Sequence, residues 1–242
     1  MGCGNGKSND AVLTVQSPTN QVTNRNEKVT KIQVAVVVIG TFLRKLMNVA
    51  DRCSLVAFND KYKILSLLGN EDTAINGLIS CLNSCGGGTQ LWKAVVMSAA
   101  QFIATADQSR PWILIVLTDG EDSGGGTSAK DVATALTLFN RPANNFTFFV
   151  GLGNNAGERE LRGVCNASNS LYFGARDGEA LQLIFAIVAL QIVQGVQVNI
   201  AQVRAEGIEA VYARIQQVSS LRRNPVDMLI LLDVSGSMDE AA

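Results

Sequence analysis

The chain has 242 residues, 47% of them hydrophobic, and a formal net charge of −1 at pH 7. This length and apolar content can bury one large core, while the near-neutral charge offers no basic field for nucleic acid or acidic lipid. Histidine is absent, which excludes Ser-His-Asp and Cys-His catalysis and the usual zinc ligands.

The amino-terminal segment, residues 1–27, is rich in Gly, Asn, Ser and Thr. Its weak hydrophobic periodicity predicts a flexible tail. The start Met1-Gly2-Cys3-Gly4 resembles proteins acylated at Gly2 and Cys3, although Gly6 stands where the myristoylation motif has Ser or Thr. Two interpretations are open: an acylated end and an ordinary flexible end. Stable attachment to the inner face of a membrane would need acylation at both sites.

A strongly apolar stretch follows at residues 29–47. The β-branched run 34–39 alone favours a strand, but the length and polar ends of the stretch favour a buried helix. Arg44 and Lys45 near its end suit the dipole of such a helix.

Strands and helices then alternate along the chain. Strands are predicted at residues 53–58, 62–67, 113–117, 146–150 and 171–173. Helices are predicted at residues 71–82, 91–106, 131–139, 157–165 and 179–193. The alternation predicts an α/β fold with a mostly parallel sheet, and the turn at Asn59-Asp60 makes 62–67 an antiparallel edge strand. The apolar runs 32–43 and 183–193 are too short to span a bilayer.

Two further runs, 196–203 and 210–218, read as strands, and a turn at Glu206-Gly207 makes them a candidate β-hairpin. They lie in a β-rich connecting segment, residues 196–225. We expect this segment to be a structural linker without a binding function.

The last apolar run, 228–232, is bounded by Asn224-Pro225 and reads as a buried parallel strand. The sequence Asp233-Val234-Ser235-Gly236-Ser237 follows at once. A carboxylate and two hydroxyls at the end of a strand are hard oxygen ligands suited to Mg²⁺ or Mn²⁺. Alone the motif is weak, because the same residues make ordinary turns.

Two other loops carry matching oxygens. Strand 113–117 ends in Thr118-Asp119-Gly120, and Gly86-Gly87-Gly88-Thr89 precedes the helix predicted at 91–106. Together with the D-x-S-x-S loop they resemble the metal-ion-dependent adhesion site of von Willebrand factor type A (VWA) domains. The alternative is that each loop is only a turn or a helix cap.

The resemblance implies a doubly wound, Rossmann-like sheet flanked by helices, with one bound Mg²⁺ or Mn²⁺. Ser235, Ser237 and Thr89 would offer hydroxyls to the metal. Asp233 and Asp119 would bind it directly or through water. Glu121, Asp122, Asp239 and Glu240 flank these residues, and we expect them to be solvated.

The order of the segments departs from the family, in which the D-x-S-x-S strand comes first. The chain resembles a circularly permuted VWA domain over residues 28–242, with residues 226–237 as the central strand and metal loop. Permutation is reasonable where the old ends lie close together. A strand-swapped dimer and a fragment of two domains are the alternatives, and we favour a monomer.

The resemblance implies an adhesion-type module rather than an enzyme: a partner protein's carboxylate would replace a water on the metal. Lys93 is the one nearby base candidate, and we expect it on a solvated helix face. A metal-free scaffold and, less favoured, a metal-assisted hydrolase are the competing functions. The five cysteines are odd in number and lack C-x-x-C spacing, so we expect free thiols and a cytoplasmic protein.

Overall fold

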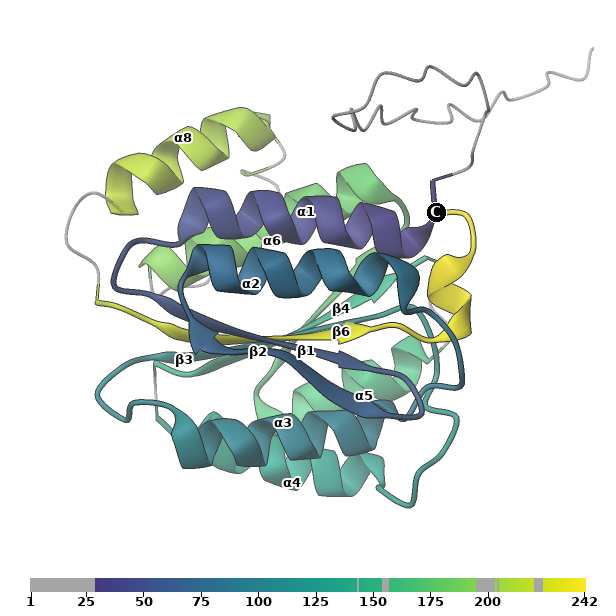
Figure 1. The fold of residues 1–242 in the computed structure, drawn as a ribbon. Helices are drawn as coiled ribbons and strands as arrows, with labels where there is room; N and C mark the ends of the chain where they lie inside the picture. The colour runs from purple at the N-terminus through teal and green to yellow at the C-terminus, as the bar shows by residue number, and fades with distance from the viewer. Residues whose placement is uncertain (1–28, 143, 154–156, 195–202, 204, 220–223) are drawn as a thin grey trace, which may run out of the picture.

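Helices cover both faces of one six-stranded sheet in the computed structural model (Figure 1), which describes residues 29–142, 144–153, 157–194, 203, 205–219 and 224–242. The strands are Arg52–Phe58 (β1), Tyr62–Gly69 (β2), Trp112–Thr118 (β3), Phe146–Leu152 (β4), Leu171–Ala175 (β5) and Asp227–Asp233 (β6). The α-helices of the described residues are Lys31–Leu46 (α1), Glu71–Ile79 (α2), Leu91–Thr105 (α3), Ala129–Phe139 (α4), Glu158–Ser168 (α5), Gly178–Gln194 (α6) and Ile208–Ser219 (α8). Two short 3₁₀-helices are Ser80–Asn83 (η1) and Gly236–Asp239 (η2).

The last strand of the chain lies in the middle of the sheet, whose order is β2-β1-β6-β3-β4-β5. Strand β6 pairs in parallel with β1 on one side and β3 on the other, and all seven of its residues are buried. Only β2 is antiparallel to its neighbour, β1. The predicted mostly parallel sheet with one antiparallel edge strand is therefore confirmed.

Alternate residues of β6 face two separate cores, because successive side chains of a strand point to opposite faces. Met228, Ile230 and Leu232 pack in the core under α1, α2, α6 and α8. Leu229 and Leu231 pack in the core under α3, α4 and α5. A strand covered on both faces must be apolar throughout, which explains the uninterrupted run in the sequence.

Helix α1 confirms the predicted helix over the competing strand. Thr30 caps it in a capping box, with its hydroxyl accepting a hydrogen bond from the Gln33 backbone and the Gln33 side chain bonded to the Thr30 backbone. The helix contacts α2, α6 and α8 and shares a core with the sheet, so most of its circumference is buried. Its exposed side is only a narrow stripe that includes Gln33 and Arg44, as expected for a helix packed against neighbours on most sides.

The predicted β-hairpin is wrong where it can be compared. Residues 210–218 belong to α8, and the buried residues Val211, Tyr212 and Ile215 have the i, i+1, i+4 spacing of a helix face. The period-2 alternation that suggested the hairpin lies in 196–203, which falls outside the described residues except for the helical, buried Val203.

The predicted tail, residues 1–27, also lies outside the described residues, so acylation at Gly2 and Cys3 stays a prediction. Across the described ranges, no helix combines the length and the apolar character that crossing a membrane requires. Cys53, Cys81, Cys85 and Cys165 are free thiols, and burial raises the pKa of Cys53, Cys81 and Cys165 to about 12.

A buried ion pair fixes the start of β6. Asp227 is fully buried, and its Oδ1 accepts a hydrogen bond from Arg52 Nε on β1 at 2.8 Å. Its Oδ2 accepts from the Asp107 backbone N–H at 2.9 Å, and Arg110 Nη1 lies 3.5 Å from Oδ1. The carboxylate thus ties β6 to its neighbour β1 and to the loop that leads into β3.

Asp227→Ala should lower the free energy of unfolding by about 3 kcal/mol, because it leaves Arg52 and a backbone N–H without their buried partner. Urea unfolding at pH 7 measures the change. Asp72→Ala removes an exposed carboxylate from the first turn of α2 and should leave the midpoint nearly unchanged. Equal effects of the two substitutions would contradict the anchoring role.

An intramolecular β6 also predicts the mass in solution. Sedimentation equilibrium at low micromolar concentration should give 25.7 kDa, the mass of one chain. Twice that mass, persisting on dilution, would instead indicate that β6 is exchanged between two copies.

Candidate metal centre

Two of the predicted loops are joined at the carboxyl ends of β6 and β3, which are adjacent strands. Ser235 Oγ lies 3.0 Å from Ser237 Oγ. Ser237 Oγ in turn donates to Asp119 Oδ1 at 2.7 Å. Residues 118 positions apart in the chain therefore share one hydrogen-bonded cluster because their strands pair in parallel.

Thr89, in the loop before α3, lies close to this cluster. A Cβ atom placed on Gly120 would lie 3.7 Å from Thr89 Oγ1 and 3.9 Å from Ser237 Oγ, so both hydroxyls lie beside this glycine. Ser123 holds Thr89 in place: its Oγ accepts from the Thr89 N–H at 2.7 Å and donates to the Thr89 carbonyl at 2.8 Å. Ser123 is a positioning residue that the sequence motifs do not mark.

The glycine-rich loop is bonded directly to the D-x-S-x-S loop. Gly86 N–H donates to Val234 O at 2.9 Å, and Gly236 N–H donates to Gly87 O at 3.1 Å. Gly87 has φ +75°, and a Cβ there would lie 2.6 Å from Asp60 Oδ1. Glycine is therefore required at this position both for its backbone angle and for the close approach of Asp60.

Asp233 is fully buried at the base of the cluster. Thr118 Oγ1 donates to its Oδ2 at 2.6 Å, and the Ser235 N–H donates to its Oδ1 at 2.8 Å. Burial raises the pKa of Asp233 to about 6, the hydrogen bonds from Thr118 and Ser235 oppose that rise, and the charge of Asp119 adds to it. A nearby cation would stabilise the ionised carboxylate.

The donor set suits a hard divalent cation. Asp233, Asp119, Thr89, Ser235 and Ser237 supply two carboxylates and three hydroxyls, the oxygen chemistry that Mg²⁺ and Mn²⁺ favour. In the described part of the chain, no group of three or more His, Cys, Asp and Glu side chains forms a candidate metal cluster. A metal at this centre would therefore depend on hydroxyl oxygens as well as carboxylates.

Lys31, a residue that the motifs do not mark, brings a positive charge to the cluster. Its Nζ donates to Asp119 Oδ2 at 2.8 Å and to Ser237 O at 3.2 Å, and lies 3.4 Å from Glu240 Oε2. Burial opposes its charge, but hydrogen bonds and charges from Asp119 and Glu240 outweigh that effect and raise the pKa of Lys31.

The same contacts bring the end of the chain to the start of α1, as Figure 1 shows. The Lys31 N–H donates to Glu240 O, and the Ala242 N–H donates to Val29 O, each at 3.0 Å. Thr30 and Ala241 form an antiparallel bridge. Helix η2, which carries Ser237, therefore leads directly to the first turn of α1.

The flanking acids differ in their surroundings. Glu121 and Asp239 are exposed, as predicted. Asp122 is instead partly buried and accepts hydrogen bonds from the Trp92 and Gly124 N–H groups, which ties the T-D-G loop to α3. Glu240 is exposed but pairs with Lys31.

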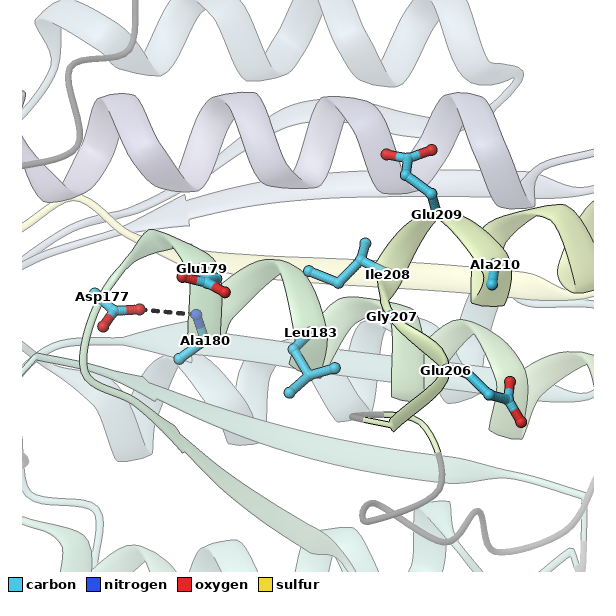
Figure 2. A pocket seen from close by; sticks show the side chains of 9 residues that line it. All are labelled: Asp177, Glu179, Ala180, Leu183, Glu206, Gly207, Ile208, Glu209 and Ala210. Carbon is cyan, nitrogen blue, oxygen red and sulfur yellow. Dashed lines mark hydrogen bonds between the residues drawn. The ribbon is translucent and has the colours of Figure 1, made fainter.

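A separate hollow of about 600 Å³ lies between the starts of α6 and α8, and Figure 2 shows the residues that line it. Its acidic lining residues are Asp177, Glu179, Glu206 and Glu209. Asp177 also caps α6 by accepting from the Ala180 N–H at 2.8 Å. The hollow shares no residue with the candidate metal centre.

Comparisons with solved structures support the fold. A von Willebrand factor type A protein from Catenulispora acidiphila is 16% identical with a TM-score of 0.53, over 66% of this chain and 38% of that one. The conserved hypothetical protein BatB from Bacteroides thetaiotaomicron is 16% identical with a TM-score of 0.52, over 71% and 88%. Proximal thread matrix protein 1 from the mussel byssus is 15% identical with a TM-score of 0.51, over 66% and 42%.

At these identities the similarity establishes the fold alone, and this chain spans well under half of the Catenulispora protein. No curated protein matches the sequence. Residues 12–187, well over half of the chain, match the family model for the von Willebrand factor type A domain, a range that ends before β6. The chain belongs to the von Willebrand factor type A domain family.

Proposed function

We propose that this VWA domain is a divalent-cation-dependent protein-interaction module that binds an acidic side chain of a partner protein. The observation that carries the proposal is the gathering of Asp233, Ser235, Ser237, Thr89 and Asp119 at one edge of the sheet. Mg²⁺ or Mn²⁺, when bound there, would supply a Lewis-acidic position for a carboxylate oxygen.

The charge of the donor set favours an acidic partner. Two carboxylates neutralise a divalent cation only formally, and the three hydroxyls add no negative charge. A partner carboxylate would thus form a charge-assisted contact with the bound cation. The cluster also lies at the carboxyl ends of parallel strands, where open α/β sheets bind their ligands.

A circularly permuted domain over residues 28–242 accounts for the order of the segments. The position of β6 between β1 and β3 supports it, because the resemblance predicts the D-x-S-x-S strand at the centre of the sheet. The hydrogen bonds between Val29 and Ala242, and between Lys31 and Glu240, also support it. They lie where the family order would continue from the metal loop into α1.

A metal-free scaffold is the second candidate function, and Lys31 is the observation in its favour. Its ammonium already offers a positive charge to Asp119. The metal-assisted hydrolase has less support: Lys93, its candidate base, is exposed and donates to Gln90 Oε1 at 3.4 Å.

The proposed location of the protein is the cytosol. The four described cysteines are free thiols, which fits a reducing compartment such as the cytosol. Attachment to the inner face of a membrane would depend on acylation of Gly2 and Cys3. Both sites lie outside the described residues.

Calorimetric titration should give saturable binding of Mn²⁺ or Mg²⁺ to the wild-type protein. Asp233→Ala should lose it, because the variant lacks the buried carboxylate. Asp239→Ala removes an exposed acid just beyond Ser237 and should keep binding within about threefold. If the wild-type protein gives no cation-dependent heat, the metal-free scaffold is the remaining function. Phosphoester turnover that is present in the wild type and absent in Asp233→Ala would favour the hydrolase.

Asp233 also predicts a pH dependence of metal-free stability. Its pKa rises from 3.8 to about 6 on folding, so between these values the folded protein holds a proton that the unfolded chain has lost. The contribution of Asp233 to stability therefore falls as the pH rises through this window. Asp233→Asn lacks this titration. As the pH rises through this window, the free energy of unfolding of the variant should therefore rise relative to that of the wild type, by an amount on the order of 2 kcal/mol.

Urea unfolding in a chelator at several pH values from 4 to about 7.5 would measure this difference. Other titrating groups cancel in the comparison, since both proteins carry them. A stability difference that stays constant with pH would contradict the buried, ionising carboxylate. Saturating Mg²⁺ should stabilise the wild-type protein above pH 6 and leave Asp233→Asn unchanged.

A further inference from the structure

An ammonium group lies inside the oxygen cluster that forms the candidate metal centre. Lys31 Nζ contacts three oxygens, from Asp119 at 2.8 Å, Ser237 at 3.2 Å and Glu240 at 3.4 Å. The Lys31 side chain is only 14% exposed, and that of Asp119 is fully buried. Lys31 is also the first residue of α1, so its backbone is fixed close to the cluster.

A divalent cation and this ammonium would share one carboxylate. Asp119 Oδ2 accepts from Lys31, while Oδ1 accepts from Ser237 Oγ. A metal held by Asp119 and Ser237 would lie within a few ångströms of Nζ. Two positive charges at that separation repel strongly, and screening is weak where the groups are buried.

Glu240 offers the ammonium a second position. Its carboxylate is already within 3.4 Å of Nζ, yet its side chain is 70% exposed, in contrast to buried Asp119. A lysine side chain has a flexible stem, so Nζ can leave Asp119 while keeping Glu240 and water as partners. The centre thus contains the Lys31 ammonium, its present partner Asp119 and an alternative partner, Glu240.

We infer that Lys31 is a built-in competitor of the divalent cation. In the metal-free protein its ammonium neutralises Asp119 beside buried Asp233; when a divalent cation binds, Nζ moves away from Asp119 towards Glu240. Lys31 therefore weakens cation binding and sets the concentration at which the centre fills. This inference rests on the proposed function, since it concerns the same centre.

Lys31→Met tests the competition because it keeps an apolar stem and removes the charge. Its Mn²⁺ dissociation constant, measured by calorimetry, should be at least about tenfold lower than that of the wild type. Lys31→Arg retains the charge and should not show this gain. Lys45→Met, the same change near the other end of α1, is the matched control for net charge and should bind as the wild type does.

The melting temperature provides a second measurement, which also reports on the metal-free protein. In a chelator, Lys31→Met should melt at a lower temperature than the wild type, because Asp119 loses its partner. In saturating Mn²⁺ the order should reverse. Lys31→Gln, which keeps a hydrogen-bond donor without the charge, should also bind Mn²⁺ more tightly and serves if Lys31→Met does not fold.

The outcomes separate this inference from the proposed function. If the wild type binds Mn²⁺ and both uncharged variants bind equally or more weakly, Lys31 is a supporting residue of the centre and the competition is overturned. If neither the wild type nor the uncharged variants bind Mn²⁺, the proposed function fails and the competition fails with it. If only the uncharged variants bind Mn²⁺, the competition by Lys31 is supported, but the proposed function of the wild-type protein fails.

Discussion

The insertion of β6 between β1 and β3 is the constraint on which the rest of the structure depends. This strand pairs on both sides, contributes residues to both cores and ends in Asp233. Its parallel register with β3 brings Asp233 to the same edge of the sheet as Asp119. Without that insertion, β1 and β3 would lack their shared neighbour, and Asp233, Ser235 and Ser237 would not be held beside Asp119 and Thr89.

The arrangement of charge at the centre follows from this packing. Asp233 is buried with two hydrogen-bond donors, and Asp119 is buried between Ser237 and Lys31. Two carboxylates close together in a buried place need positive charge nearby. The protein provides one such charge itself, and the proposed divalent cation is the other. The negative charge of the two carboxylates would then be neutralised by Lys31 in the metal-free state and by the divalent cation in the metal-bound state.

Much of the fold could be predicted because long apolar runs and their turns mark β1, β3, β4 and β6 directly. The gathering of the three loops was expected from the family resemblance; cation binding by them stays a prediction. Helix α8 was missed because β-branched residues near 196–203 suggested alternation, whereas burial of Val211, Tyr212 and Ile215 against neighbouring helices decides for a helix. Lys31 could not be found from spacing, since its partners Asp119 and Ser237 are 88 and 206 positions away.

The junction between η2 and α1 is made of hydrogen bonds, among them those from Lys31 and Ala242, and not of a continuous backbone. In a domain with the family's order, a covalent link at this place would keep the serine loop attached to the helix through every thermal fluctuation. Here the contact between residues 240–242 and the start of α1 is held by hydrogen bonds, and such a contact can open locally at a cost below that of global unfolding. The contact between η2 and α1 beside the candidate metal centre can therefore open locally without straining the core.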